Sequence, residues 1–142
     1  MASVYDVAAY ILGQCGSTSA MKLQKLVYYC QAWSLVWEDR PIFGERIEAW
    51  ANGPVTPELY NAHRGQFIVS QIREGNPGAL GSADRSTVDA VLKYYGDKSA
   101  QWLSDLTHKE DPWANARHGL EAGLPSRREI TLAAMAEYYG SL

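Results

Sequence analysis

The chain has 142 residues, which is the usual size of one domain with one hydrophobic core. Hydrophobic residues make up 46% of it and charged residues 20%, a balance that is typical of a folded domain and excludes a largely disordered chain. The formal net charge of −3 argues against a domain built mainly on nucleic-acid phosphate contacts, which rest on clustered Lys and Arg. We therefore expect a single domain over residues 1–142.

The sequence also predicts neither a secretory signal nor a membrane span. The first residues lack a basic start, and the longest apolar run, Leu26–Cys30, is far shorter than the roughly 20 residues that cross a bilayer. A cytoplasmic protein with no membrane partner is the expectation.

The first two predicted elements are helices. Apolar residues recur at helical spacing from Val4 to Leu12, Ser3 is the predicted N-cap, and Gly13 and Gly16 mark the end. A longer helix is predicted over residues 20–37. It carries apolar and aromatic side chains around most of its circumference, so we expect it to be the central, most buried helix.

The middle of the chain predicts a small β-hairpin within residues 41–50, on either side of a glycine-containing turn. Asn52-Gly53-Pro54 then predicts a turn, and Thr56 before Pro57 predicts the start of a short helix. The apolar pattern weakens after Gly65, and residues 74–82 are rich in turn formers. We expect a mobile loop there.

The second half is predicted to be helical. Helix starts are indicated by capping residues or by proline at Ser86 with Asp89, at Ser99, at Pro112, and at Ser126 with Glu129. The last helix carries two competing apolar stripes, which leaves its buried face open. The whole pattern predicts a mainly α fold: a single compact helical domain of about six helices, with a small β-hairpin element in the first half.

No catalytic or metal-binding pattern is present. His63, His108 and His118 are scattered without a metal-ligand spacing, and Cys15 and Cys30 form no CxxC motif. A histidine and two carboxylates do occur within residues 108–111, but a solvated helix end explains them more simply. A Cys–His pair would require the apolar helix face around Cys30 to meet a distant histidine. We expect no cofactor, no metal and no enzymatic activity.

DNA binding is the main alternative from the residues alone. The predicted helix over residues 20–37 follows a Ser-Thr-Ser turn and a shorter helix, which is the outline of a helix-turn-helix. Its Lys22, Gln24 and Lys25 are confined to the start, and the remainder is largely apolar. Nucleic acid is therefore disfavoured as a partner, and a transcriptional autoregulator that binds operator DNA stays as the alternative.

Three segments carry a more specific pattern: residues 21–33 (MKLQKLVYYCQAW), 47–60 (IEAWANGPVTPELY) and 103–113 (LSDLTHKEDPW). In this order and spacing they resemble the signature segments of the SocA-like, Panacea-domain antitoxins, a group that includes phage-associated proteins. The resemblance extends over about residues 5–140. Cys30 stands where that family usually has alanine, which is a small change in a packed helix.

The resemblance implies a bacterial or phage antitoxin that neutralises a co-encoded, cognate protein toxin by direct protein contact, without a cofactor or catalysis. The family also includes an adaptor type that delivers its toxin to a ClpXP-type protease. Both routes, blocking the toxin and sending it to the protease, stay open at this point.

Candidate partner-binding residues come from the same segments. The turn at Gly53 and Pro54 is predicted to present Glu48, Asn52 and Val55 to the toxin, because loops on a rigid scaffold often carry binding residues. A neighbouring polar patch is predicted to contain Lys22, Lys25, His108 and Trp113. The alternative for both groups is structural: a fixed turn, and solvated helix ends. The leucines and aromatic residues of the segments are expected to form core before interface.

Overall fold

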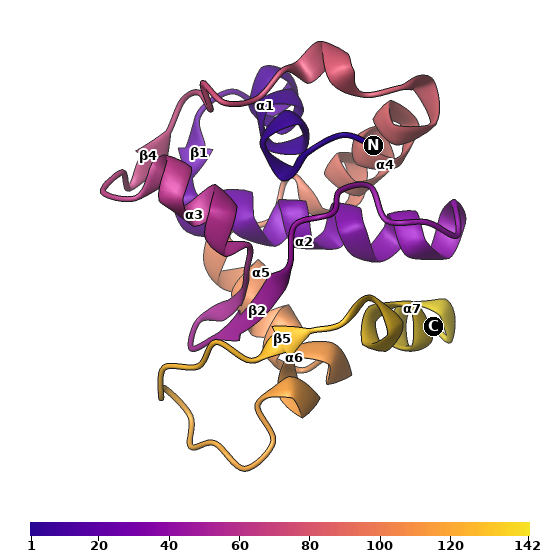
Figure 1. The fold of residues 1–142 in the computed structure, drawn as a ribbon. Coiled ribbons are helices and arrows are strands. Elements are labelled where there is room, and N and C mark those ends of the chain that lie inside the picture. Colours follow the sequence, from indigo (N-terminus) through magenta and orange to yellow (C-terminus); the bar gives the residue numbers. More distant parts are fainter.

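The computed structural model describes residues 1–142 and contains seven α-helices, one short 3-10 helix and two small antiparallel sheets (Figure 1). The α-helices are α1 (Val4–Cys15), α2 (Ala20–Trp37), α3 (Pro57–His63), α4 (Ser82–Tyr95), α5 (Ala100–His108), α6 (Asp111–Ala116) and α7 (Leu132–Gly140), and the 3-10 helix η1 is Pro77–Ala79. The strands are β1 (Thr18–Ser19), β2 (Ile47–Trp50), β3 (Gly53–Val55), β4 (Ile68–Val69) and β5 (Glu129–Ile130). The prediction of a mainly α domain is confirmed.

Helix α2 runs through the middle of the molecule, in contact with α1, α4, α5 and α7 (Figure 1). Its start is capped by Ser19, whose hydroxyl accepts a hydrogen bond from the Lys22 amide. Every residue from Leu23 to Ala32 is buried, which confirms the prediction of a central helix. A DNA-reading helix needs an exposed face of polar side chains, so α2 does not serve as one.

The predicted hairpin lies later in the chain than residues 41–50. Strands β2 and β3 pair with Trp50 opposite Gly53, so the hairpin spans residues 47–55. Residues 42 and 43 have another partner: the Gln31 carboxamide accepts from the Ile42 amide at 2.8 Å and donates to the Phe43 carbonyl at 2.8 Å. These buried contacts to α2 satisfy the backbone without strand pairing, which local sequence pattern does not reveal.

Strand pairing is also more extensive than one hairpin. Strand β5 pairs with the other edge of β2, which gives the sheet order β3-β2-β5, and β1 pairs with β4 in a second sheet. The prediction that Ser126 and Glu129 start the last helix is therefore wrong, since Glu129 belongs to β5. Thr131 is the N-cap instead, with its hydroxyl accepting from the Ala134 amide.

One further helix boundary differs from expectation, and the structure decides which face of the last helix is buried. Helix α4 begins at Ser82, four residues before the predicted cap at Ser86, and the turn-rich stretch before it contains η1. In α7, Met135 and Tyr139 are buried, although Leu132 at the start of the same stripe is 43% exposed. In the competing stripe, Ala133 is exposed and Tyr138 is only half-buried. The stripe that contains Met135 and Tyr139 is thus the one that packs.

A tyrosine cluster joins the two halves of the core. The Glu110 carboxylate accepts hydrogen bonds from the hydroxyls of Tyr29 at 2.6 Å and Tyr139 at 2.7 Å, and the Tyr29 ring stacks on Tyr95 with centroids 4.2 Å apart. Burial raises the pKa of Glu110, whereas the two hydroxyl donors lower it. The cluster links α2, α4 and α7 at the N-terminus of α6, and so fixes where α6 lies.

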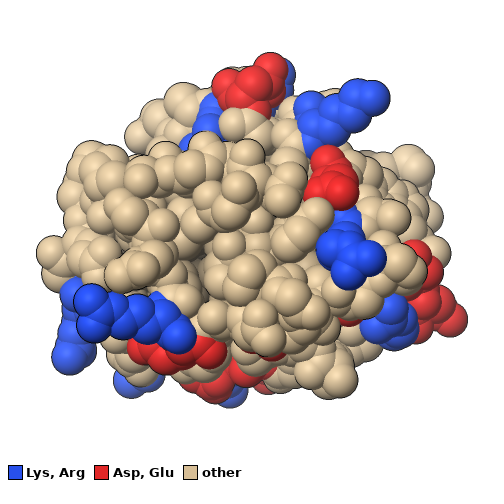
Figure 2. Space-filling model, turned by 90° about the horizontal axis from the view of Figure 1, so that it is seen from above, with Lys and Arg blue, Asp and Glu red and all other residues tan.

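The surface is unevenly charged. Seen from above, Lys, Arg, Asp and Glu lie mainly toward the edges of the molecule and leave a broad uncharged area between them (Figure 2).

None of the helices combines the length and the apolar composition that a membrane span requires.

Candidate functional site

The β2–β3 hairpin is built around the side chain of Lys25. Lys25 is only 1% exposed, and its ammonium donates to the Pro54 carbonyl at 3.3 Å. Gly53 has φ +129°, a conformation that favours glycine, and a Cβ at this position would overlap the end of the Lys25 side chain. Burial lowers the pKa of Lys25 to about 8. A glycine at position 53 of the second segment therefore leaves the space that Lys25 of the first segment occupies.

Gln24 fixes the chain that leaves the hairpin. Its carboxamide oxygen accepts from the Thr56 amide at 2.9 Å, and its nitrogen lies 3.3 Å from the Thr56 carbonyl and 3.0 Å from His63 Nε2. Because the oxygen is the acceptor, the nitrogen is the donor, and His63 Nε2 must accept. Burial lowers the pKa of His63, which agrees with a neutral ring.

Glu48 is a buried carboxylate on β2 with three donors around it. It accepts from the Trp50 indole at 2.9 Å and pairs with Arg46 at 3.1 Å and Arg127 at 3.6 Å. These contacts satisfy a charge that would otherwise be costly to bury. Glu48 orients Trp50 and Arg127, and its negative charge is already paired with Arg46 and Arg127.

The third segment packs against the back of the hairpin strand through aromatic stacking. The His108 and Trp113 rings are stacked with centroids 4.0 Å apart, and the Trp113 indole donates to the Trp50 carbonyl at 2.8 Å. Arg117 donates to the Ala49 carbonyl at 2.9 Å and lies over the Trp113 ring. These residues tie α5 and α6 to β2.

The His108 ring lies in a locally positive environment. Burial lowers its pKa, and the charges of Lys25 and Arg117 act in the same direction, whereas an Asn52 backbone group and the Asp105 charge raise it. Its Nε2 is buried without a hydrogen-bond partner. A neutral ring at this position is therefore favoured.

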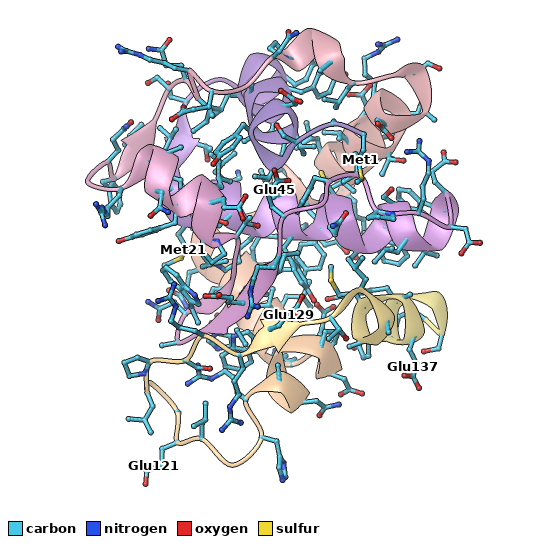
Figure 3. All side chains as sticks on the ribbon, in the orientation of Figure 1. Met1, Met21, Glu45, Glu121, Glu129 and Glu137 are labelled. Carbon is cyan, nitrogen blue, oxygen red and sulfur yellow. The ribbon has the colours of Figure 1, made fainter.

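A cleft of about 660 Å³ opens between the start of α2, the hairpin, α3 and the segment before β5. Figure 3 shows Met21, one of its lining residues, at the start of α2, facing the hairpin side of the molecule. The aromatic part of its wall is Trp50 and Tyr60, whose rings meet edge to face at 5.0 Å. The charged lining residues are Lys25, Arg64 and Arg127, and none of the lining residues is Asp or Glu.

The structure brings some of the predicted partner-binding residues together and separates others. Lys25, Asn52 and Val55 line the cleft. Glu48 lies behind the wall and is engaged with Arg46 and Arg127. Lys22 is apart from the others, because its ammonium donates to the Gly96 carbonyl at 2.7 Å, at the end of α4.

His108 and Trp113 also lie outside the cleft lining. They are not solvated helix ends, because both are partly buried in the stack that supports β2. Their contribution to the cleft is to hold the strand that carries Trp50.

Sequence reasoning missed several residues of the cleft. Gln24 and Tyr60 belong to the conspicuous segments, but their chemistry gave no reason to single them out. Arg64 follows the second segment, and Arg127 lies between Ser126 and Glu129, a stretch that was predicted only to start the last helix. The signal that could have found Tyr60 and Arg64 is the short helix that Pro57 was predicted to open, because Tyr60 lies on it and Arg64 directly follows it.

Neither cysteine lines the cleft. Cys30 is fully buried, which raises the pKa of its thiol, and Cys15 is the exposed last residue of α1. No group of three His, Cys, Asp or Glu side chains is placed to hold a metal ion. What remains is a concave surface with an aromatic wall and three cationic side chains.

Comparison with known proteins gives one match. A family model described as "Antitoxin SocA-like, Panacea domain" matches residues 23–114, which is about two thirds of the chain and extends from α2 into α6. No curated protein and no solved structure matches the chain. The matched region contains Gln24, Lys25 and the whole hairpin, and excludes Arg127.

Proposed function

Because this chain belongs to the SocA-like antitoxin family with a Panacea domain, we propose that it neutralises a protein toxin by binding it directly, through the cleft beside the β2–β3 hairpin. The toxin is proposed to be encoded next to this chain's gene. Binding is stoichiometric, with no turnover and no cofactor.

The observation that supports this proposal is the convergence of two segments on one cleft. Gln24 and Lys25 from the first segment, and Trp50, Asn52 and Tyr60 from the second, line the same concave surface. Many residues of these segments are core residues, as an antitoxin scaffold requires. Trp50, Asn52 and Tyr60 are exposed or half-buried and available to a partner, whereas Gln24 and Lys25 are buried beneath them. Aromatic side chains in such a place are typical anchors of protein interfaces.

Hydrogen bonds fix the chain segments that form the walls of the cleft. Gln24 holds Thr56, Lys25 holds Pro54, and the Ser104 hydroxyl donates to the Asn52 carbonyl at 2.6 Å. A surface that is already ordered loses little conformational entropy on binding, which favours a tight complex. The hairpin therefore presents its turn to a partner in a fixed geometry.

The test is co-expression of the chain with the protein encoded beside its gene. Growth rescue, with a complex that copurifies through a wash at high salt, is the expected result, because an interface with an aromatic core resists salt screening. Rescue without a complex, or no rescue, would overturn the proposal.

The fate of the toxin separates two forms of neutralisation. We propose occlusion of the toxin as the main route, in which toxin abundance stays constant after protein synthesis is stopped. Delivery to a ClpXP-type protease predicts instead that the toxin disappears when the antitoxin is present and persists in cells that lack the protease.

A further inference from the structure

The cleft has a charge opposite to that of the whole molecule. The chain carries a net charge of −3, yet the charged residues that line the cleft are all basic: Lys25, Arg64 and Arg127. Among them, Arg127 pairs with Glu48, which lies behind the wall and also pairs with Arg46. The cleft is therefore a local cationic site on an acidic protein.

The three cations differ in how they are engaged. Arg64 is exposed and forms none of the protein's ion pairs, so its guanidinium is free to bind a partner group. Arg127 is 81% exposed and contacts Glu48 with only one nitrogen, at 3.6 Å. A guanidinium has five N–H donors in a planar arrangement that fits a carboxylate, so both arginines retain donors.

Lys25 is buried beneath the surface of the cleft and acts on it through its charge. It has no carboxylate partner, one of its three donors is used on Pro54, and Gly53 is shaped to accommodate it. A buried cation without a counter-ion is costly, and its field is weakly screened in the protein interior. Burial lowers the pKa of the neighbouring His108 ring, and the Lys25 charge acts in the same direction. A negative group in the cleft would supply the counter-ion that the fold omits.

We infer that the cleft receives an acidic side chain of the bound protein toxin, with Arg64 and Arg127 as its direct partners and Lys25 stabilising its charge from below. This inference rests on the proposed function. Trp50 and Tyr60 form the apolar wall beside this position, so the partner segment places an apolar residue next to the Asp or Glu. Charge complementarity of this kind sets which partner is accepted.

The experiment measures the dissociation constant of the complex between this chain and the protein encoded beside its gene, for Arg64→Glu and its matched control Arg73→Glu. Arg73 is also exposed and free of ion pairs, but it lies outside this cleft. We expect Arg64→Glu to weaken binding at least tenfold and Arg73→Glu to have little effect. Each acidic residue of the partner is then changed to Arg in turn, and one of these changes is expected to restore binding to Arg64→Glu while weakening binding to the unchanged chain.

Three further results would overturn the inference, and they are distinguishable. If the unchanged chain forms no complex, the proposed function fails as well. If Arg64→Glu, Arg127→Gln and Arg73→Glu all bind equally, the toxin binds without using the cationic cleft. If Arg64→Glu weakens binding but no charge reversal on the partner restores it, the arginine does not contact an acidic side chain. Because Arg64 and Arg127 are exposed, these variants are expected to fold, which circular dichroism checks.

Discussion

Replacing Gly53 with alanine tests whether the hairpin is built around Lys25. Two costs add at this position. An alanine at φ +129° carries backbone strain of roughly 1–3 kcal/mol, and its Cβ would overlap the Lys25 side chain. Because Lys25 is buried and also hydrogen-bonded to Pro54, it cannot move into solvent, so overpacking adds roughly 1–3 kcal/mol.

We therefore expect Gly53→Ala to lower the free energy of unfolding by about 2–6 kcal/mol, a large part of the 5–15 kcal/mol typical of a domain. The measurement is urea unfolding followed by circular dichroism. Gly65→Ala is the matched control: Gly65 also has positive φ, at +89°, but no atom lies within 4 Å of its added Cβ. That variant should show the strain alone.

A double-mutant cycle isolates the contact. Lys25→Ala removes the overlapping atoms and leaves only Thr107 Oγ1 close to the added Cβ, at 3.2 Å, so in that background Gly53→Ala should cost little more than Gly65→Ala does. The reasoning is refuted if Gly53→Ala is no more destabilising than Gly65→Ala in the unchanged chain, or if the cost of Gly53→Ala stays the same when Lys25 is replaced.

Three other predictions concern buried polar groups. The pKa of His63, whose Nε2 accepts from Gln24, is lowered in the folded protein. The stabilising contribution of the neutral ring should therefore be fully present above pH 6.5 and fall as the pH drops below that value, because the unfolded chain takes up the proton first. A His63→Gln variant should lose this part of the pH dependence in urea unfolding at pH 5.5 and 7.5. Glu110→Ala should lower the free energy of unfolding by about 2–4 kcal/mol, because two buried tyrosine hydroxyls lose their acceptor. Glu110→Gln keeps a carbonyl oxygen and should lower it markedly less, so equal losses in calorimetry would contradict the hydrogen-bond account. The Lys25 ammonium should titrate near pH 8 by ¹⁵N NMR. Stability should therefore rise above pH 8, because the unfolded lysine still keeps its proton there. A titration near 10.5 would show that the group is solvated.

Local patterns predicted the elements that depend on local interactions. The bounds of α2 follow from its apolar sequence and the Ser19 cap, and α1 has the predicted N-cap at Ser3, whose hydroxyl accepts from the Asp6 amide. The strands were harder because their partners are distant in the chain. Residues 41–46 look like part of a hairpin until Gln31 is known to bond the backbone of Ile42 and Phe43, and β5 exists because β2 offers it a free edge.

The candidate site divides in the same way. Lys25, Asn52 and Val55 were expected at the binding surface and do line the cleft, because the helix and the turn that carry them were predicted correctly. Lys22 was grouped with Lys25, since residues three apart lie on the same face of a helix, but the Lys22 ammonium donates to the Gly96 carbonyl and does not line the cleft. Arg127 reaches the cleft only through the pairing of β5 with β2, which no local pattern predicts.

The central claim is that this chain binds a protein toxin through the cleft, and a cleft-filling variant tests it most directly. Asn52→Trp places a large side chain at the exposed turn, where the asparagine's structural hydrogen bond is made by its backbone carbonyl and not by its side chain. Gln14→Trp, at an exposed position of α1 away from the cleft, is the control. Calorimetric titration with the protein encoded beside the gene should give a stoichiometric complex for the unchanged chain and for Gln14→Trp, and at least tenfold weaker binding for Asn52→Trp. Equal affinities of all three proteins would contradict the account.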